Sequence, residues 1–142
     1  MASYSTKESL GYWISRSARK IDKYFESYLQ DFEFTPNEYA ILNSIHSKEA
    51  NKPSELARFL NMDKGYIARQ LMRLEEKRYI HRSDDKSDKR SHAIVLTKKG
   101  EGIIQSLING SVETNKKISS VLSPQERAAL LKSLKKLGNA DF

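Results

Sequence analysis

The stretch that decides the fold is Ile80–Gly100, with the sequence IHRSDDKSDKRSHAIVLTKKG. Two short runs flank a polar tip. The first run begins at Ile80, and the second contains Ile94, Val95 and Leu96, whose alternation lets one face of a strand pack against other elements. This pattern predicts a β-hairpin, and the segment directly before it has the pattern of a helix.

The predicted tip of the hairpin carries charges of both signs. A carboxylate can hold a nearby arginine in a fixed orientation, and Asp88 is close enough in sequence to do that for Arg90. Ordinary solvated turn chemistry would give a similar composition, so the tip does not indicate a function without its neighbours. The charged residues are Asp84, Asp85, Lys86, Asp88, Lys89 and Arg90.

The helix predicted before the hairpin, about residues 64–77, has its apolar side chains on one side and its polar and basic side chains on another. At about 100° per residue, Ile67, Leu71 and Leu74 share a narrow sector that should be buried. Polar and basic side chains gather beside that sector. Arginine can bind guanine and glutamine adenine through paired hydrogen bonds, while tyrosine or lysine can bind phosphate. The candidate DNA contacts are Lys64, Tyr66, Arg69, Gln70, Arg73 and Lys77.

Two alternatives to these contacts stay open. A polar face on a helix can simply be solvated. Gln70 lies nearest the apolar sector of the candidates, so it can instead line the boundary of the buried face.

Capping signals divide the rest of the chain. Thr35-Pro36-Asn37-Glu38 and Ser123-Pro124-Gln125-Glu126 both have the capping-box pattern that opens a helix. Asn61-Met62-Asp63 predicts a tight turn, with Asp63 as the N-cap of the helix that follows. Two short helices joined by such a turn form the helix-turn-helix pattern. A fifth helix should begin after Thr97, although its Gly102 and Gly110 weaken the prediction of a regular helix.

The first helix has a long apolar seam. Its members recur at steps of four and three residues, as expected when one helix packs on others. This apolar seam is long for a helix of so small a domain, and other parts of the same chain need not cover all of it. The seam therefore invites a partner subunit; its residues are Ile14, Ala18, Ile21, Phe25, Tyr28 and Phe32.

Composition sets further limits. The 142 residues predict one domain, or a small domain with helical extensions. The formal net charge of +7, from 25 Lys and Arg against 18 Asp and Glu, favours nucleic acid or an anionic membrane surface as a partner. The absence of cysteine excludes disulfides and thiolate metal sites. Without a signal-peptide core or an apolar run near the roughly 20 residues that span a bilayer, a cytoplasmic protein is expected, with no membrane partner.

Neither a metal site nor an enzyme is expected. The histidines His46, His81 and His92 have no metal-ligand spacing on one helix, although a site shared between strands or subunits stays open. The chain has no cysteine nucleophile, no phosphate-binding glycine loop and no convincing histidine–carboxylate arrangement. We therefore expect no cofactor and no catalytic residue.

With these motifs in place, the chain resembles the MarR family of bacterial transcription regulators. The strongest match is Asp88-Lys89-Arg90 followed by Leu96-Thr97-Lys98-Lys99-Gly100, which fits that family's Asp-x-Arg wing and Leu-Thr-x-x-Gly exit. One departure is Arg78, which stands where many relatives have glycine, so the fourth helix should end just before it. Further matches are Leu56-Ala57, Ile67-Ala68-Arg69, Arg73-Leu74-Glu75-Glu76-Lys77, Ile80 and Arg82.

The resemblance implies a mainly α fold with a small β-hairpin wing. It implies an N-terminal dimerisation helix over residues 1–34, a winged helix-turn-helix DNA-binding lobe over 35–99 and C-terminal dimerisation helices over 100–142. Such a homodimer would bind a pseudo-palindromic site in double-stranded DNA. The fourth helix would enter the major groove, and Arg90, with Lys89 beside it and Asp88 orienting it, the minor groove.

The family resemblance also suggests regulation, most simply as a repressor relieved by a small molecule. Members of the family often bind aromatic or phenolic anions, and such an effector could be bound by Tyr12, Trp13, Arg16 and Tyr39. The alternative is that these aromatic side chains serve core or dimer-interface packing. A second alternative, for the whole protein, is a protein-interaction module that keeps the winged-helix shape without specific DNA binding.

Overall fold

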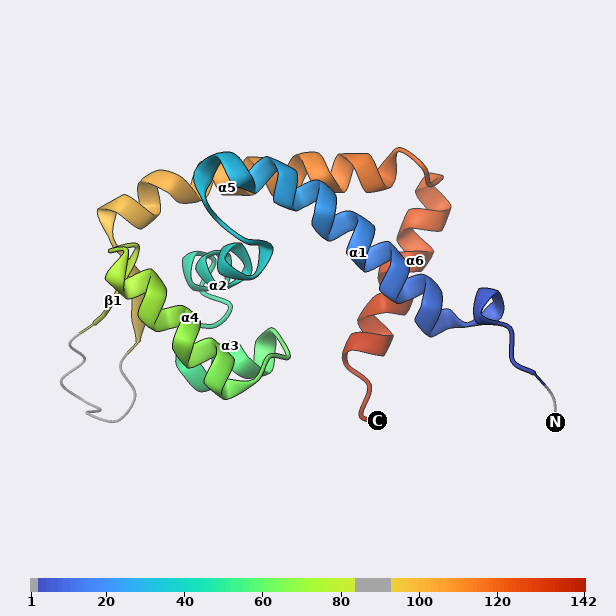
Figure 1. Ribbon diagram of the computed structural model, residues 1–142, viewed down its shortest axis with the longest axis horizontal. Helices are drawn as coiled ribbons and strands as arrows, with labels where there is room; N and C mark the ends of the chain where they lie inside the picture. The colour runs from blue at the N-terminus through green and yellow to red at the C-terminus, as the bar shows by residue number, and fades with distance from the viewer. Residues whose placement is uncertain (1–2, 84–92) are drawn as a thin grey trace. The chain divides into compact units, whose positions relative to one another are not determined.

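The computed structural model describes residues 3–83 and 93–142. This part of the chain is mostly helical, with one two-stranded antiparallel sheet, as the sequence predicts (Figure 1). It divides into two compact units. We call Phe25–Gly110 the lobe, and Met1–Tyr24 together with Ser111–Phe142 the terminal unit.

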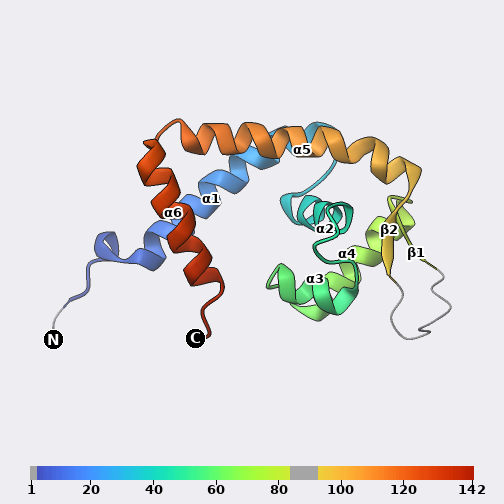
Figure 2. The ribbon, with the colours of Figure 1, turned by 180° about the vertical axis from the view of Figure 1, so that it is seen from behind.

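The lobe contains the helix-turn-helix and the hairpin. These are formed by α2 (Pro36–His46), α3 (Pro53–Phe59), α4 (Lys64–Glu76), β1 (Ile80–Arg82) and β2 (Ile94–Leu96). The two strands lie side by side, with Ile80 opposite Leu96 and Arg82 opposite Ile94 (Figure 2). The predicted hairpin is therefore confirmed where the chain is described.

The remaining elements are two short 3₁₀ helices and three α-helices. They are η1 (Thr6–Glu8), α1 (Leu10–Leu29), η2 (Gln30–Phe32), α5 (Lys98–Ser119) and α6 (Pro124–Gly138). Both α1 and α5 contribute residues to each unit.

The division of the chain predicted near residues 34 and 99 stays a prediction. The boundaries between the two compact units fall inside α1 and α5. The reason is burial. Phe25 and Leu29 at the end of α1 belong to the lobe's core, and so do Ile104 and Leu107 of α5. Each helix therefore changes surroundings along its length without a break in the backbone.

Caps fix the helix starts as predicted. In the first turn of α2, Thr35 Oγ1 accepts from the Glu38 amide at 3.1 Å, and Glu38 Oε1 accepts from the Thr35 amide at 3.3 Å. Asp63 accepts from the Tyr66 amide at 3.1 Å and caps α4. The second capping box, at Ser123, opens α6. There, hydrogen bonds from the Ser123 backbone and then its side chain hold the pKa of Glu126 below its usual value.

The two units differ in how far their apolar side chains are buried. Among the described residues, every buried apolar side chain lies in the lobe, including Leu42, Leu56 and Leu74 with no exposed surface. The terminal unit keeps large apolar side chains at its surface instead: Leu10, Trp13, Ile14, Tyr24, Val112, Val121, Leu130, Leu131, Leu134 and Leu137 are all more than 40% exposed.

A set of hydrogen bonds made by Thr97, which we call the joint at Thr97, connects the turn after α4, the hairpin and α5. The Thr97 hydroxyl donates to the Arg78 carbonyl at 2.6 Å and accepts from the Gly100 amide at 3.1 Å. The Thr97 amide donates to the Tyr79 carbonyl at 3.0 Å. One residue thus caps α5 and ties it to the turn after α4.

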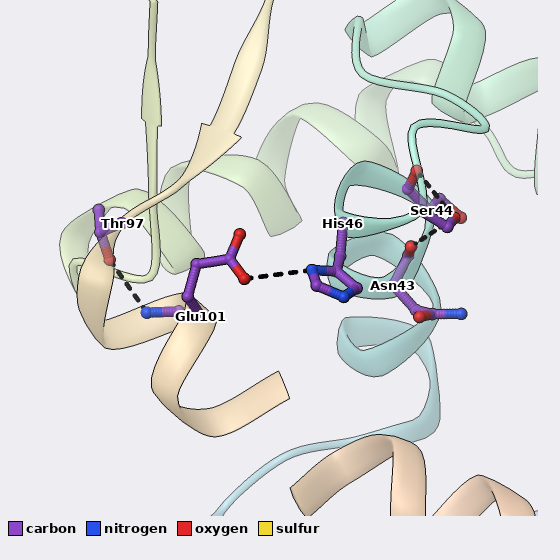
Figure 3. Close-up of polar contacts among 7 residues, drawn as sticks. Asn43, Ser44, His46, Thr97 and Glu101 are labelled. Carbon is purple, nitrogen blue, oxygen red and sulfur yellow. Dashed lines mark hydrogen bonds and ion pairs between the residues drawn. The ribbon is translucent and has the colours of Figure 1, made fainter. Parts of the chain in front are cut away.

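A histidine–carboxylate contact joins the same first turn of α5 to α2. His46 Nδ1 lies 3.2 Å from Glu101 Oε2, and the Glu101 amide donates to the Thr97 carbonyl at 2.9 Å (Figure 3). The start of α5 is therefore held on two sides within the lobe.

The glycines of α5 have different roles. A side chain at Gly110 would overlap the ring of Tyr28, whose hydroxyl donates to the Ser106 carbonyl at 3.1 Å. Gly102 faces open space. The helix is continuous, so the irregularity suggested by its glycines is absent.

We predict that Gly100→Ala destabilises the protein by about 1–3 kcal/mol, because its methyl group would overlap the Tyr79 carbonyl oxygen and force the backbone to shift. The matched control is Gly102→Ala in the same helix. It should stabilise by about 0.5–1 kcal/mol, since alanine favours helix and nothing lies nearby. Urea unfolding measures both, and a neutral Gly100→Ala would contradict the close approach.

Candidate nucleic-acid interface

The candidate interface is built on α4, whose two ends are fixed by hydrogen bonds. At its C-terminal end, the Arg78 amide donates to the Glu75 carbonyl at 2.9 Å and the Tyr79 amide to the Leu74 carbonyl at 3.0 Å. This is the Schellman motif, which places one residue in the left-handed region. Arg78 occupies that position with φ 65°, where glycine is favoured. The helix ends before Arg78, as predicted.

One face of α4 is buried as the sequence predicts. Ile67, Leu71 and Leu74 are at most 2% exposed and belong to the lobe's core. Gln70 is only 9% exposed, which agrees with its expected place at the boundary of this face.

The first turn of α2 covers part of the polar sector of α4. The Asn37 side-chain amide donates to the Tyr66 hydroxyl at 2.8 Å. On the next residue, Glu38 Oε2 lies 3.6 Å from Lys77 Nζ. Tyr66 and Lys77 are therefore turned partly toward the protein, a placement that helix periodicity does not reveal.

Three of the predicted contacts remain exposed and unpaired. Lys64, Arg69 and Arg73 are exposed, and the side chains of all three make no hydrogen bond or ion pair with any described residue. Arg69 and Arg73 line a shallow hollow along α4 together with Tyr66, Gln70, Met72 and Glu76. Two guanidinium groups are thus available for an anionic or hydrogen-bond-accepting partner.

The outward face of α4 also carries apolar residues that the sequence analysis, which selected polar and basic side chains, did not find. Ala68 and Met72 are exposed, Met72 by 58%, and they lie beside the two arginines. Small apolar groups on such a face can contact thymine methyl groups in a major groove. At about 100° per residue, both lie outside the sector shared by Ile67, Leu71 and Leu74, and that position was the signal that could have found them.

At the base of the wing, Arg82 Nε lies 3.9 Å from Glu75 Oε2, which connects β1 to the end of α4. The wing residues predicted to contact DNA, Lys89 and Arg90, and the predicted orienting residue Asp88 lie outside the described residues.

The aromatic residues proposed for an effector pocket have packing partners. Tyr39 in the lobe packs edge-on against Phe25, with ring centroids 5.1 Å apart. In the terminal unit, Tyr12 and Trp13 form a similar pair at 5.1 Å, and Trp13 Nε1 donates to the Lys7 carbonyl at 2.6 Å. Whether these residues bind an effector or serve packing stays a prediction. The fourth residue, Arg16, is exposed in the terminal unit.

Residues 3–83 and 93–142 contain no cluster of three or more His, Asp or Glu side chains able to hold a metal ion. Over the same residues, no helix is both long and apolar enough to cross a membrane.

Two helices joined by a tight turn, followed by a two-stranded hairpin, define a winged helix-turn-helix protein. Residues 34–92 match the model of the MarR family. This part of the chain is a winged-helix domain of the MarR family of transcriptional regulators.

Similar proteins include the HTH-type transcriptional regulator SarZ of Staphylococcus aureus, 27% identical over 99% of this chain and 93% of SarZ. A mutant of E. coli MarR, solved in complex with operator DNA, is 29% identical over 90% of this chain and 92% of its own, with a TM-score of 0.81. BpsR of Bordetella bronchiseptica, whose DNA binding is regulated by 6-hydroxynicotinic acid, shares the fold with a TM-score of 0.89 at 20% identity, over 99% and 100% of the two chains.

We predict that Arg78→Gly stabilises the protein by about 0.5–1 kcal/mol, because glycine adopts the left-handed conformation without the steric cost that arginine incurs. Lys77→Gly is the control. Lys77 has φ −77° and gains nothing from glycine, so this change should destabilise. Chemical denaturation compares them; lower stability for Arg78→Gly would mean that its side chain matters more than its backbone.

Proposed function

We propose that this protein is a homodimeric transcriptional regulator that binds a pseudo-palindromic site in double-stranded DNA. The observation that carries the proposal is the pair Arg69 and Arg73, exposed on α4 and unpaired among the described residues. Arginine binds guanine O6 and N7 through two hydrogen bonds in the major groove. The operator-bound structure of the E. coli MarR mutant supports this use of the fold.

The other predicted contacts take supporting roles. Lys64, at the start of α4, is exposed and suits a phosphate contact. Arg90 would probe the minor groove with Asp88 orienting it, as the family resemblance implies, and Lys89 would be a further DNA contact. The net charge of +7 favours such a polyanionic partner.

The terminal unit supports a homodimer. No apolar side chain described in it is buried, and α6 has no buried residue at all. An amphipathic helix gains most of its stability by burying its apolar face, so α6 needs a surface to pack on. The exposed Leu130, Leu134 and Leu137 follow one another at helical spacing and give a second copy such a surface.

We also propose that the protein acts as a repressor released by a small aromatic or phenolic anion. A hollow in the terminal unit is lined mainly by apolar side chains, among them Ile21, Ile118 and Leu122. Lys20 and Lys117 also line it. Apolar walls and ammonium groups suit such an anion. Whether Tyr12, Trp13, Arg16 and Tyr39 also contact the effector stays a prediction.

Titration with salicylate tests the effector proposal. Binding should raise the melting temperature, because a ligand that binds the folded state stabilises it, and should lower DNA affinity. If salicylate and related phenolic acids change neither quantity, regulation by this chemical class is contradicted.

We predict that Arg69→Ala weakens specific DNA binding by about 1–3 kcal/mol, roughly 5- to 150-fold, because a guanine contact is lost. Lys77→Ala is the comparison. Because Lys77 is paired with the buried Glu38, its loss should lower stability more than DNA affinity.

Fluorescence anisotropy with an operator selected from a random pool measures both variants. Wild-type affinity should fall with salt at a log–log slope of about −0.9 per neutralised phosphate. No specific site and a flat salt dependence would instead favour the protein-interaction module.

We predict that Leu134→Glu shifts the dimer toward monomer by at least about tenfold, since a charge would be buried in an apolar interface. Gln125→Glu adds the same charge in the first turn of α6 and should leave the dimer intact. Sedimentation equilibrium distinguishes them. A monomeric wild type, or equal dimerisation by both variants, would remove this face from the interface.

A further inference from the structure

Asn37 and Tyr66 make a hydrogen bond across 29 residues of sequence, and both are held by caps. Asn37 follows Pro36 in the first turn of α2, where the Thr35–Glu38 capping box fixes the backbone. Tyr66 lies in the first turn of α4, with its amide bound to the Asp63 carboxylate at 3.1 Å. The distance of 2.8 Å from Asn37 Nδ2 to the Tyr66 hydroxyl therefore joins two rigid helix starts.

The direction of this hydrogen bond determines which further hydrogen bond the Tyr66 hydroxyl can make. The side-chain amide donates, so the phenol oxygen acts as the acceptor. A phenol has one hydrogen of its own to donate. No described residue receives that hydrogen from Tyr66, whose ring is partly exposed at the hollow beside Arg69 and Arg73. The hydroxyl is thus oriented as a donor beside the guanidinium groups of Arg69 and Arg73, which are unpaired among the described residues.

We propose that Asn37 is a positioning residue that turns Tyr66 into a hydrogen-bond donor to one DNA phosphate beside the major groove. This inference rests on the proposed function. A phosphate oxygen is a charged acceptor with no hydrogen to donate, so it matches a phenol whose acceptor role is already used. Such a contact carries no sequence information but fixes the register of α4 on the duplex.

The neutral donor gives the contact a signature that a lysine or arginine contact lacks. Losing a cationic phosphate contact reduces the salt slope by about one, because one fewer counterion is released. Losing Tyr66's hydrogen should lower affinity while the salt slope stays unchanged. A purely structural role for the tyrosine would give no dependence on one particular phosphate.

The test is a double-mutant cycle on a selected operator, with Asn37→Ala, Tyr66→Phe and the double variant. Tyr66→Phe should weaken binding about 5- to 10-fold, and Asn37→Ala by a similar or smaller factor. The double variant should bind no worse than Tyr66→Phe alone, because Asn37 acts through the hydroxyl. Additive losses in the cycle would overturn the proposal.

A second arm replaces single phosphates of the operator by methylphosphonates. One position should weaken wild-type binding and have no effect on Tyr66→Phe or Asn37→Ala. Asn37→Asp, which offers an acceptor in place of the donor, should cost more affinity with Tyr66 present than in the Tyr66→Phe background. If no phosphate position discriminates the variants, the proposal is contradicted.

The outcomes separate this inference from the proposed function. If the wild type binds no specific site, the proposed function fails. Suppose instead that the wild type binds a specific site, that Arg69→Ala weakens this binding, and that the double-mutant cycle is additive. Then only the role proposed for Asn37 is contradicted. Unfolding midpoints of all variants, compared with that of the wild type, exclude a general loss of folding as the cause.

Discussion

The candidate interface depends on the first turn of α2. Glu38 is 8% exposed, and burying a carboxylate without partners costs several kcal/mol. Here the charge is met by the Thr35 amide at 3.3 Å and by Lys77 Nζ at 3.6 Å. The neighbouring Asn37 holds Tyr66, so one turn of helix contacts α4 near both of its ends. Because α4 is oriented by these contacts and by its apolar face, Arg69 and Arg73 need take no part in holding the fold.

A second constraint, the joint at Thr97, connects this lobe to the long helix that leaves it. The threonine hydroxyl and amide bind the carbonyls of Arg78 and Tyr79, directly after α4, while the hydroxyl also caps α5. Gly100 allows the start of α5 to approach the Tyr79 carbonyl. The Leu-Thr-x-x-Gly sequence thus has a structural role. Its hydrogen bonds connect the end of α4, the second strand and the start of α5.

Local patterns predicted much of this fold. Both capping boxes, the cap at Asp63 and the buried face of α4 follow from residues at most a few positions apart. The contacts that cover Tyr66 and Lys77 could not be predicted, because they come from residues 29 and 39 positions earlier in the chain. Angular sorting tells which side chains share a sector but not which element packs against it. The boundaries of the two compact units could not be predicted for a related reason, since α1 and α5 run through both without a turn or a helix-breaking residue.

The central claim is that the outward face of α4 carries the arginines that read DNA in a dimeric protein. Dimethyl sulfate protection of a selected operator tests it most directly, because the reagent methylates guanine N7 in the major groove, where arginine would bind. We predict protected guanines in two half-sites about 10 base pairs apart, or a multiple of that spacing, with protection lost in Arg69→Ala. Specific binding without any guanine protection, or protection that persists in both Arg69→Ala and Arg73→Ala, would contradict the account.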